Sequence, residues 1–519
     1  MHRVFPLPLP TPDRRDLRRR TARILTVAAR TLTPPLVRRA LRRPDAAQPF
    51  ARPLRVLFET LGVTFVKFGQ LVASSPGVFG DAVADEFRSC LDTGPAVPSD
   101  VVRATVATSL GAPLGDVFAS LDDEAIGRAS MAVVHRATLH DGRAVAVKVL
   151  RPAIETTVAT DLRLMAPLLD VLAFRVGIPE AGQLVRMLDG FREQLTEELD
   201  LRNEARAMAH HRELARTLGL ERIVVPAPLV ELSGQRVLVM DFLDGVPIDD
   251  HAAIAALGVD PRPLLDELVR AWFITALRDG TFHADAHAGN ILVLRDGRVG
   301  VVDWGIVGRL DARTLRFLRR TVEGGLGDAT AWNDIADEFL ANYGPALIDG
   351  LGLDRDGLAE FSRGIVEPML TRPFGEVSLG KFLAAWQGNV AEAEGRPVER
   401  PTLLQRLARL RRQRDLHVGV ARHGGRGTSF DRGTFLLAKQ LLYFERYGKM
   451  FLGDTSLLAD RAFFERLLRD RPLDGADAPD LDVPDAPELN ARRGAADRAA
   501  SAASPPAAPA EARADPRPR

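Results

Sequence analysis

The sequence predicts an α+β chain with two lobes, a small strand-rich lobe followed by a larger helical one. Strand signals gather in residues 125–245, where short β-branched runs flank tight-turn dipeptides. From about Ile248 to Leu468 the apolar residues recur mostly at helical spacing. A helical pattern also precedes the strands, from Arg52 to about Leu121. We therefore expect a helical extension, then a β-rich lobe, then a helical lobe.

The composition is that of an ordinary globular protein. Of the 519 residues, 46% are hydrophobic and 27% are charged, and the formal net charge is zero, which favours no nucleic-acid partner. The single cysteine, Cys90, excludes an intramolecular disulfide and is expected to be an inert buried thiol in a reducing compartment. We find neither a signal peptide nor an apolar run long enough to cross a bilayer, so we expect a cytoplasmic protein.

Residues 1–50 form a basic arm, in which apolar residues such as Leu17, Ile24 and Val27 lie among many arginines. The arm fits an amphipathic helix on the anionic inner face of a membrane, where the protein would be peripheral. A solvated helix or a partly disordered arm is the more ordinary interpretation. The arginines are Arg14, Arg15, Arg18, Arg19, Arg20, Arg23, Arg38, Arg39, Arg42 and Arg43.

The first strands are predicted as a hairpin. Ala132–Leu139 and Ala144–Leu150 are β-rich runs on either side of the turn dipeptide Asp141-Gly142. A long helical pattern follows from Ile154 to Leu218. The small lobe is therefore expected to carry helices after its third strand.

Two further pairs of strands are predicted. Ile223–Leu232 and Arg236–Met240 are expected to form a second pair, and Ile291–Leu294 and Val299–Val302 to interrupt the helical lobe. This order of elements is the layout of the protein-kinase fold. The predicted boundaries are residues 51–121 for the extension, 122–245 for the small lobe, 246–470 for the helical lobe and 471–519 for a disordered tail rich in Ala, Pro, Asp and Arg.

The segment from His283 to Asn290 carries the strongest chemical signal. Asp285 is followed five residues later by Asn290, and Asp303-Trp304-Gly305 comes after a short hairpin. In a kinase catalytic loop, the Asp orients or deprotonates the attacking hydroxyl, while the Asn and the later Asp bind metal ions. A zinc site at His283, Asp285 and His287 is a weaker interpretation, because it accounts for neither Asn290 nor Asp303.

Lys148 ends the run Val145–Lys148 and matches the phosphate-binding lysine of the V-A-I-K motif. Glu198, Asp200 and Glu204 are candidates for the carboxylate that holds it. In isolation, a surface lysine and a solvated acidic helix face would be the simpler explanation. The loop has Ala284 in place of the usual arginine, no G-x-G-x-x-G precedes the first hairpin, and no A-P-E lies between Gly305 and the helical pattern that begins at Ala312. A platform for a peptide substrate is therefore hard to find.

With these departures, the chain resembles the UbiB/AarF family of atypical kinases. The resemblance runs in order from about Leu54 to Leu310 and implies a protein-kinase-like fold with an additional N-terminal helical motif. The segments that carry it are Leu61–Gln70 (K-x-G-Q), Gly127–His135 (an alanine-rich loop in place of a glycine-rich one), Val145–Pro152, Glu198–Asp200 (E-x-D), His283–Leu292 and Val301–Leu310.

The resemblance implies a role for each matching residue. Asp285 would be the catalytic Asp, assisted by Lys148, and Asn290 and Asp303 would hold Mg²⁺. The nucleotide would be bound by Lys148 with Glu204, by Ala129 and Ser130 of the alanine-rich loop, and by Met240 and Asp241 at the hinge. Lys67 and Gln70 would face Glu198 and Asp200, so that the K-x-G-Q helix covers the cleft and regulates access to it.

The expected function is that of an ATP- and Mg²⁺-dependent atypical kinase or ATPase. The family's link to isoprenoid quinone biosynthesis implies a lipid or quinone-precursor ligand. A nucleotide-binding scaffold without catalysis is the first alternative, which the covered cleft favours and the full set of metal ligands opposes. A small-molecule phosphotransferase of the aminoglycoside or choline kinase type is the second, and the K-x-G-Q segment discriminates against it.

Overall fold

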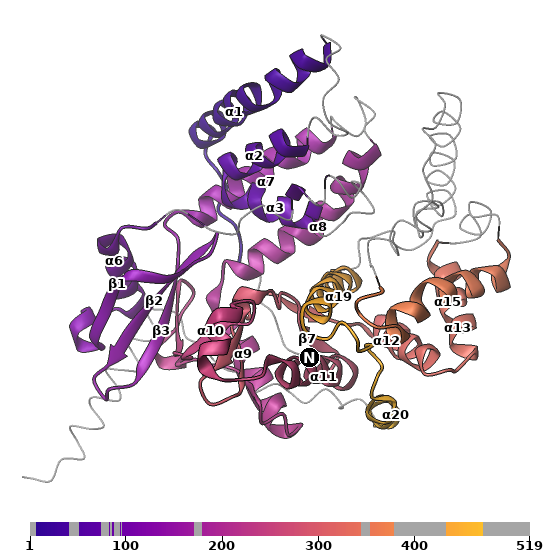
Figure 1. The fold of residues 1–519 in the computed structure, drawn as a ribbon. Coiled ribbons are helices and arrows are strands. Elements are labelled where there is room, and N and C mark those ends of the chain that lie inside the picture. Colours follow the sequence, from indigo (N-terminus) through magenta and orange to yellow (C-terminus); the bar gives the residue numbers. More distant parts are fainter. Residues whose placement is uncertain are drawn as a thin grey trace, which may run out of the picture.

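The computed structural model describes residues 7–40, 51–73, 83, 86–87, 94, 96–170, 179–343, 353–377 and 432–470. These residues form a β-rich lobe, a helical lobe and a layer of helices above them (Figure 1). The two-lobed α+β arrangement predicted from the sequence is thereby confirmed. Cys90, residues 41–50 of the arm and the tail at 471–519 lie outside the described residues.

The small lobe is built on one four-stranded antiparallel sheet in the order β1-β2-β3-β5. The predicted hairpin is confirmed, because β2 is Ala132–Leu139 and β3 is Ala144–Leu150. The predicted helical pattern up to Leu121 is wrong at its end, and the boundary at 121/122 falls inside β1, Phe118–Arg128. Three consecutive acidic residues in β1 hide its strand pattern, and three irregularities in its register with β2 interrupt the alternation.

The second predicted hairpin forms only in part. β5, Val237–Asp241, forms as expected and pairs with β3, while the segment before it meets β5 at a single antiparallel bridge, with Pro228 opposite Met240. The segment before it yields a two-residue strand, β4 (Ile223–Val224), which pairs in parallel with β9 in a second sheet. Pro226 and Pro228 lack the amide hydrogens that a continuous ladder needs. The second sheet has the order β4-β9-β8-β6, with β6 at Gly245–Pro247, β8 at Ile291–Leu294 and β9 at Val299–Val301.

The helical stretch between the strands of the small lobe is confirmed. It forms α7 (Ile154–Asp170), α8 (Pro179–Glu198) and α9 (Leu201–Thr217), and Asp200 caps α9 by accepting a hydrogen bond from the backbone N of Arg202. Helix α6 (Ser99–Leu110) packs against one face of the small lobe's sheet. Within the described ranges, the helices of the larger lobe are α10 (His251–Leu257), α11 (Pro261–Arg278), α12 (Ala312–Gly325), α13 (Thr330–Tyr343), α15 (Arg355–Thr371), α19 (Arg432–Phe451) and α20 (Arg461–Arg469).

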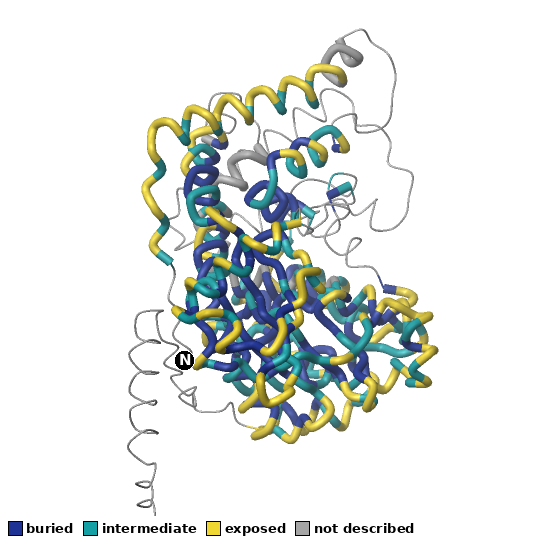
Figure 2. The backbone as a smooth tube through the Cα atoms, turned by 90° about the vertical axis from the view of Figure 1, so that its left-hand side faces the viewer, coloured by how far each residue is buried: buried dark blue, intermediate teal, exposed yellow. Residues whose placement is uncertain are grey.

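The N-terminal arm forms a helix, α1 (Arg14–Ala40), that lies on the outside of the helical layer (Figures 1 and 2). This layer also holds α2 (Ala51–Leu61) and α3 (Val63–Ala73), together with α7 and α8. Arg20 fastens α1 to it, since its guanidinium donates to both oxygens of Asp161 at 2.6 and 2.8 Å. In the described part of the chain, no helix is both long and apolar enough to span a bilayer.

Candidate functional site

Two short strands bring the distant motifs of the helical lobe together. β7 (Thr281–His283) ends two residues before Asp285, and β10 (Val307–Arg309) begins four residues after Asp303. The two strands pair antiparallel, with His283 opposite Val307. Gly308 permits this approach, because a Cβ there would lie 2.1 Å from the Phe282 ring. The pairing therefore fixes the two loops that carry the acidic candidates side by side.

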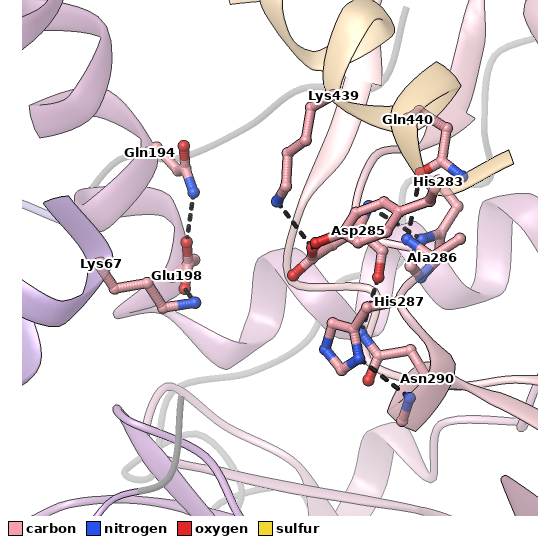
Figure 3. Close-up of polar contacts among 12 residues, drawn as sticks. Lys67, Gln194, Glu198, His283, Asp285, Ala286, His287, Asn290, Lys439 and Gln440 are labelled. Carbon is pink, nitrogen blue, oxygen red and sulfur yellow. Dashed lines mark hydrogen bonds and ion pairs between the residues drawn. The ribbon is translucent and has the colours of Figure 1, made fainter. Parts of the chain in front are cut away.

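The loop after β7 is held by its own buried polar groups. The backbone N of Asp285 donates to Nδ1 of His283 at 3.2 Å, so Nε2 of that ring carries the hydrogen and donates to the Val302 carbonyl at 3.3 Å. Burial lowers the pKa of His283, which keeps the imidazole neutral. Both ring nitrogens are thus used within the protein, which argues against the zinc interpretation. Asn290 Nδ2 donates to the Asp285 carbonyl at 2.9 Å (Figure 3).

Lys148 lies at the centre of a buried charge cluster that joins the two lobes. Its ammonium is 2.9 Å from Glu204 on α9 and 2.7 Å from Asp303 Oδ1. Asp303 has the left-handed φ of +58°, which Asp tolerates better than most residues. Trp304, which follows it, is buried against the rings of His211 and His283. The aromatic after Asp303 is therefore a packing residue, and it holds the strained turn in place.

The charges in this cluster shift one another's titration. Although burial opposes ionisation, Lys148 lowers the pKa of Asp303 to about 2. The two carboxylates raise the pKa of Lys148 well above its ordinary value, against the desolvation of the ammonium. Burial, together with the charges of Asp303 and Glu198, raises the pKa of Glu204 to about 7 despite the attraction of Lys148. Asp303 and Lys148 are therefore ionised at neutral pH, and Glu204 is the group that titrates.

The K-x-G-Q segment lies on α3 and reaches the end of α8. Lys67 Nζ is 3.1 Å from Glu198 Oε2, and Gln194 Nε2 donates to the other oxygen of Glu198 at 2.9 Å (Figure 3). Both members of the Lys67–Glu198 pair are about nine-tenths buried. Asp200 forms a bidentate pair with Arg202 in addition to capping α9. The two acidic residues of E-x-D therefore face different partners, and Glu198 is the one that meets Lys67.

A small cavity lies where these groups meet. Its volume is 30 Å³, room for only a few water molecules. Among the described residues, the Ser130 hydroxyl at its wall is buried without a hydrogen-bond partner. Ala129 lines it too, and its carbonyl accepts from Arg151 at 2.9 Å. The predicted residues that line the cavity are Lys67, Ala129, Ser130, Lys148, Glu198, Glu204, Asp285 and Asp303.

Other predicted residues lie outside the wall of this cavity. Met240 and Asp241 end β5, opposite Ala146 and Val145 of β3, and Asp241 accepts from the backbone N of Ala227 at 3.1 Å. Asn290 lies in the loop after β7 and bonds to the backbone of Asp285 and not to its carboxylate. A larger hollow of 730 Å³ lies against α9, but none of the predicted site residues lines it.

One site residue escaped sequence reasoning. Lys439, on α19, forms an ion pair of 2.7 Å with Asp285 Oδ1 (Figure 3). Burial of the Asp285 carboxyl raises its pKa, but the positive charge of Lys439 outweighs this effect. The pKa of Asp285 is therefore well below its usual range. In the sequence, Lys439 is notable only as a lysine within the apolar helical run of Phe435 to Leu442. The neighbouring residues do not indicate that its partner is Asp285.

Comparisons with known proteins place the chain among kinase-like proteins. The model of the ABC1 atypical kinase-like domain matches residues 89–327. An aarF domain-containing protein kinase of Arabidopsis thaliana, described as uncharacterized and chloroplastic, is 32% identical over 415 residues, which are 79% of this chain and 73% of that protein. The chain belongs to the UbiB/AarF family of atypical kinases. The resemblance found in the sequence is thereby confirmed.

Two bacterial relatives match a smaller share of the chain. An uncharacterized protein of Mycobacterium tuberculosis is 40% identical over 281 residues, 53% of this chain and 56% of that protein. A probable protein kinase UbiB of Marinobacter nauticus is 33% identical over 345 residues, 64% of this chain and 60% of the relative. This UbiB/AarF protein thus spans just over half of each of these two relatives.

The raised pKa of Glu204 gives this UbiB/AarF protein a specific pH dependence. Between the ordinary value of 4.5 and about 7, the folded protein binds more protons at Glu204 than the unfolded chain does. Stability from this group is therefore complete below pH 4.5 and is lost as pH rises through 7. We expect wild type to lose about 3 kcal/mol of unfolding free energy between pH 5 and 8 relative to Glu204→Gln, measured by urea denaturation. Identical pH profiles for the two proteins would contradict the assignment.

Proposed function

We propose that this chain binds Mg²⁺-ATP between its lobes and acts as an ATP-dependent phosphotransferase or ATPase. The observation that carries the proposal is the buried ammonium of Lys148, shared between Glu204 of the small lobe and Asp303 of the helical lobe. A kinase lysine bound to the α- and β-phosphates is held by the same kind of carboxylate. The unpartnered hydroxyl of Ser130 supplies a donor for a phosphate oxygen at the same cavity.

The residues also suit Mg²⁺, which binds through one or two protein oxygens together with substrate phosphates and water. Asp303 keeps a third of its side chain exposed beside the cavity. The Asn290 amide is oriented by its bond to the Asp285 carbonyl, which leaves Oδ1 as the end that could bind a cation. In the proposed mechanism, Asp303 and Asn290 would hold the ion, which would supply positive charge beside the phosphates. Asp285 accepts the proton of the attacking hydroxyl or water, and Lys148 orients the nucleotide.

The helical layer restricts what the acceptor can be. The buried pair of Lys67 and Glu198 holds α3 at the entrance of the cavity, where Lys67 itself forms part of the wall. We infer that Lys67, Gln70, Glu198 and Asp200 regulate access and that the acceptor is a small or lipid-like molecule and not a protein. Membership of the UbiB/AarF family, whose link to isoprenoid quinone biosynthesis the resemblance implies, supports a role in isoprenoid quinone or prenyl-lipid metabolism. The exposed arginines of α1 suit a peripheral contact with anionic membrane.

A nucleotide-binding scaffold without catalysis is the second candidate. Two observations favour it: the cavity is far too small for ATP as it stands, and Asp285 is already engaged by Lys439. The cavity must therefore open before a nucleotide can enter. Turnover measurements distinguish the two candidates.

The decisive experiment is phosphate release from Mg²⁺-ATP by the purified chain, with and without anionic liposomes. We expect turnover in wild type and a decrease of about 10³-fold in Asp285→Asn, because the amide cannot take the proton. Stimulation by liposomes would support a lipid-facing role. ATP binding without turnover under either condition would favour the scaffold.

A further inference from the structure

Helix α19, from the far C-terminal part of the described chain, is fixed to the catalytic loop by a row of side chains (Figure 3). Gln440 Oε1 accepts from the backbone N of Ala286 at 3.2 Å, and the Tyr447 hydroxyl donates to the carbonyl of the same residue at 2.8 Å. Both side chains are fully buried. Two bonds to one residue of the loop, from positions seven apart on one helix face, leave α19 little freedom to shift along the loop.

This attachment places one ammonium at the acidic end of the site. Lys439 Nζ lies 2.7 Å from Asp285 Oδ1, and its side chain is 12% exposed. The Tyr443 hydroxyl, one turn further along, is 3.5 Å from the same oxygen. An ammonium has three hydrogens to donate, and Asp285 takes one of them. The ammonium of Lys439 can therefore donate to a further acceptor beside the proposed base.

Among the described residues that line the cavity, the two lysines are each already paired with a carboxylate. Lys148 is divided between Glu204 and Asp303, and Lys67 is paired with Glu198. Between Asp285 and Asn290 the catalytic loop contains no lysine or arginine. Phosphoryl transfer builds negative charge on the oxygens of the moving group, and cations placed there lower the barrier.

We propose that Lys439 is a catalytic residue, whose ammonium binds the phosphoryl group in flight between the nucleotide and the acceptor. The inference rests on the proposed function. A nucleotide on Lys148 and Asp303 would direct its terminal phosphate toward Asp285, and Lys439 is the ammonium already in contact with that carboxylate. Helix α19 therefore completes the active site by supplying a cation that the catalytic loop lacks.

The step is balanced without a further reactant. The acceptor oxygen forms a bond to the terminal phosphorus as the bond from that phosphorus to the bridging oxygen breaks, and ADP leaves with that oxygen. The acceptor proton passes to Asp285. Lys439 remains protonated throughout and contributes only electrostatic attraction.

The test compares wild type, Lys439→Met, Lys439→Arg and Lys449→Met in the full chain. Lys449 lies on the same helix but pairs with Glu445 at the surface, so Lys449→Met removes an equal charge about 15 Å from Lys439. Single-turnover phosphate release is measured together with calorimetric binding of Mg²⁺-ADP and of a non-hydrolysable Mg²⁺-ATP analogue.

We expect Lys439→Met to lower turnover by about 10²-fold to 10³-fold. It should also reduce the preference for the ATP analogue over ADP by about tenfold, because only the analogue carries the terminal phosphate. Lys439→Arg should retain part of both properties, and Lys449→Met should match wild type. A lysine that only fastens α19 would not change the preference between the two nucleotides.

Two results would overturn the inference while leaving the proposed function intact. In the first, Lys439→Met has the same turnover and the same nucleotide preference as wild type, while Asp285→Asn is inactive. The other is faster turnover in Lys439→Met, which would make the contact a restraint on Asp285. A wild-type protein that neither binds nor hydrolyses Mg²⁺-ATP would refute both proposals.

Discussion

Replacement of Asp303 by asparagine is expected to abolish Mg²⁺-dependent binding of ATP while leaving the fold intact. Asparagine has nearly the same volume and tolerates the left-handed φ of +58°, so the turn before Trp304 should persist. The variant loses the negative charge that would bind the metal ion, and Lys148 keeps only Glu204 as a partner. Calorimetric affinity for Mg²⁺-ATP should fall by at least about 100-fold.

Asp296→Asn is the matched control, because Asp296 is an exposed carboxylate in the turn just before β9 and pairs with neighbouring Arg298. Its affinity for Mg²⁺-ATP should equal that of wild type. A thermal-shift titration with ATP and EDTA separates the roles further, since Asp303→Asn should respond equally with and without metal. Unchanged Mg²⁺-ATP affinity in Asp303→Asn would exclude this residue as a metal ligand.

Arg20→Met is expected to lower the free energy of unfolding by about 3 kcal/mol. The carboxylate of Asp161 is fully buried, and Arg20 is its bidentate partner. Without the guanidinium, an uncompensated charge remains beneath α1. Urea denaturation measures the loss, and a shift of the Asp161 titration toward higher pH should accompany it, because burial already raises the pKa of this group.

Arg15→Met, on the exposed side of the same helix, should change stability by less than about 0.5 kcal/mol. The double variant Arg20→Met/Asp161→Leu should recover part of the lost stability, since two apolar groups replace the pair. If Arg20→Met were as stable as Arg15→Met, α1 would not depend on this contact.

Local patterns account for the parts of the structure that were predicted correctly. The Asp141-Gly142 turn dictates the β2–β3 hairpin, and the short strands at Ile291–Leu294 and Val299 onward follow from β-branched runs around another Asp-Gly turn. The acidic and amide residues of the candidate site were found because kinase chemistry requires them at fixed spacing along the chain.

The failures are cases in which distant parts of the chain decide the outcome. β4 pairs with β9 and not with the strand that follows it in sequence, which prolines alone do not predict. Asp285 and Lys439 are separated by 154 positions, and no repeating pattern links residues at that range. The same holds for Arg20, whose partner on α7 becomes evident only when the helices are packed.

The cavity and the ion pair of Lys439 with Asp285 beside it draw on three stretches of chain that lie far apart in the sequence. The segment matched by the family model, residues 89–327, includes Lys148, Asp285 and Asp303 but neither Lys67 nor Lys439. A chimera that exchanged only this segment between two relatives would join one parent's cleft to the other parent's covering helices. We therefore expect a chimera of two family members to keep an intact site only when α3 and α19 are transferred together with the central segment.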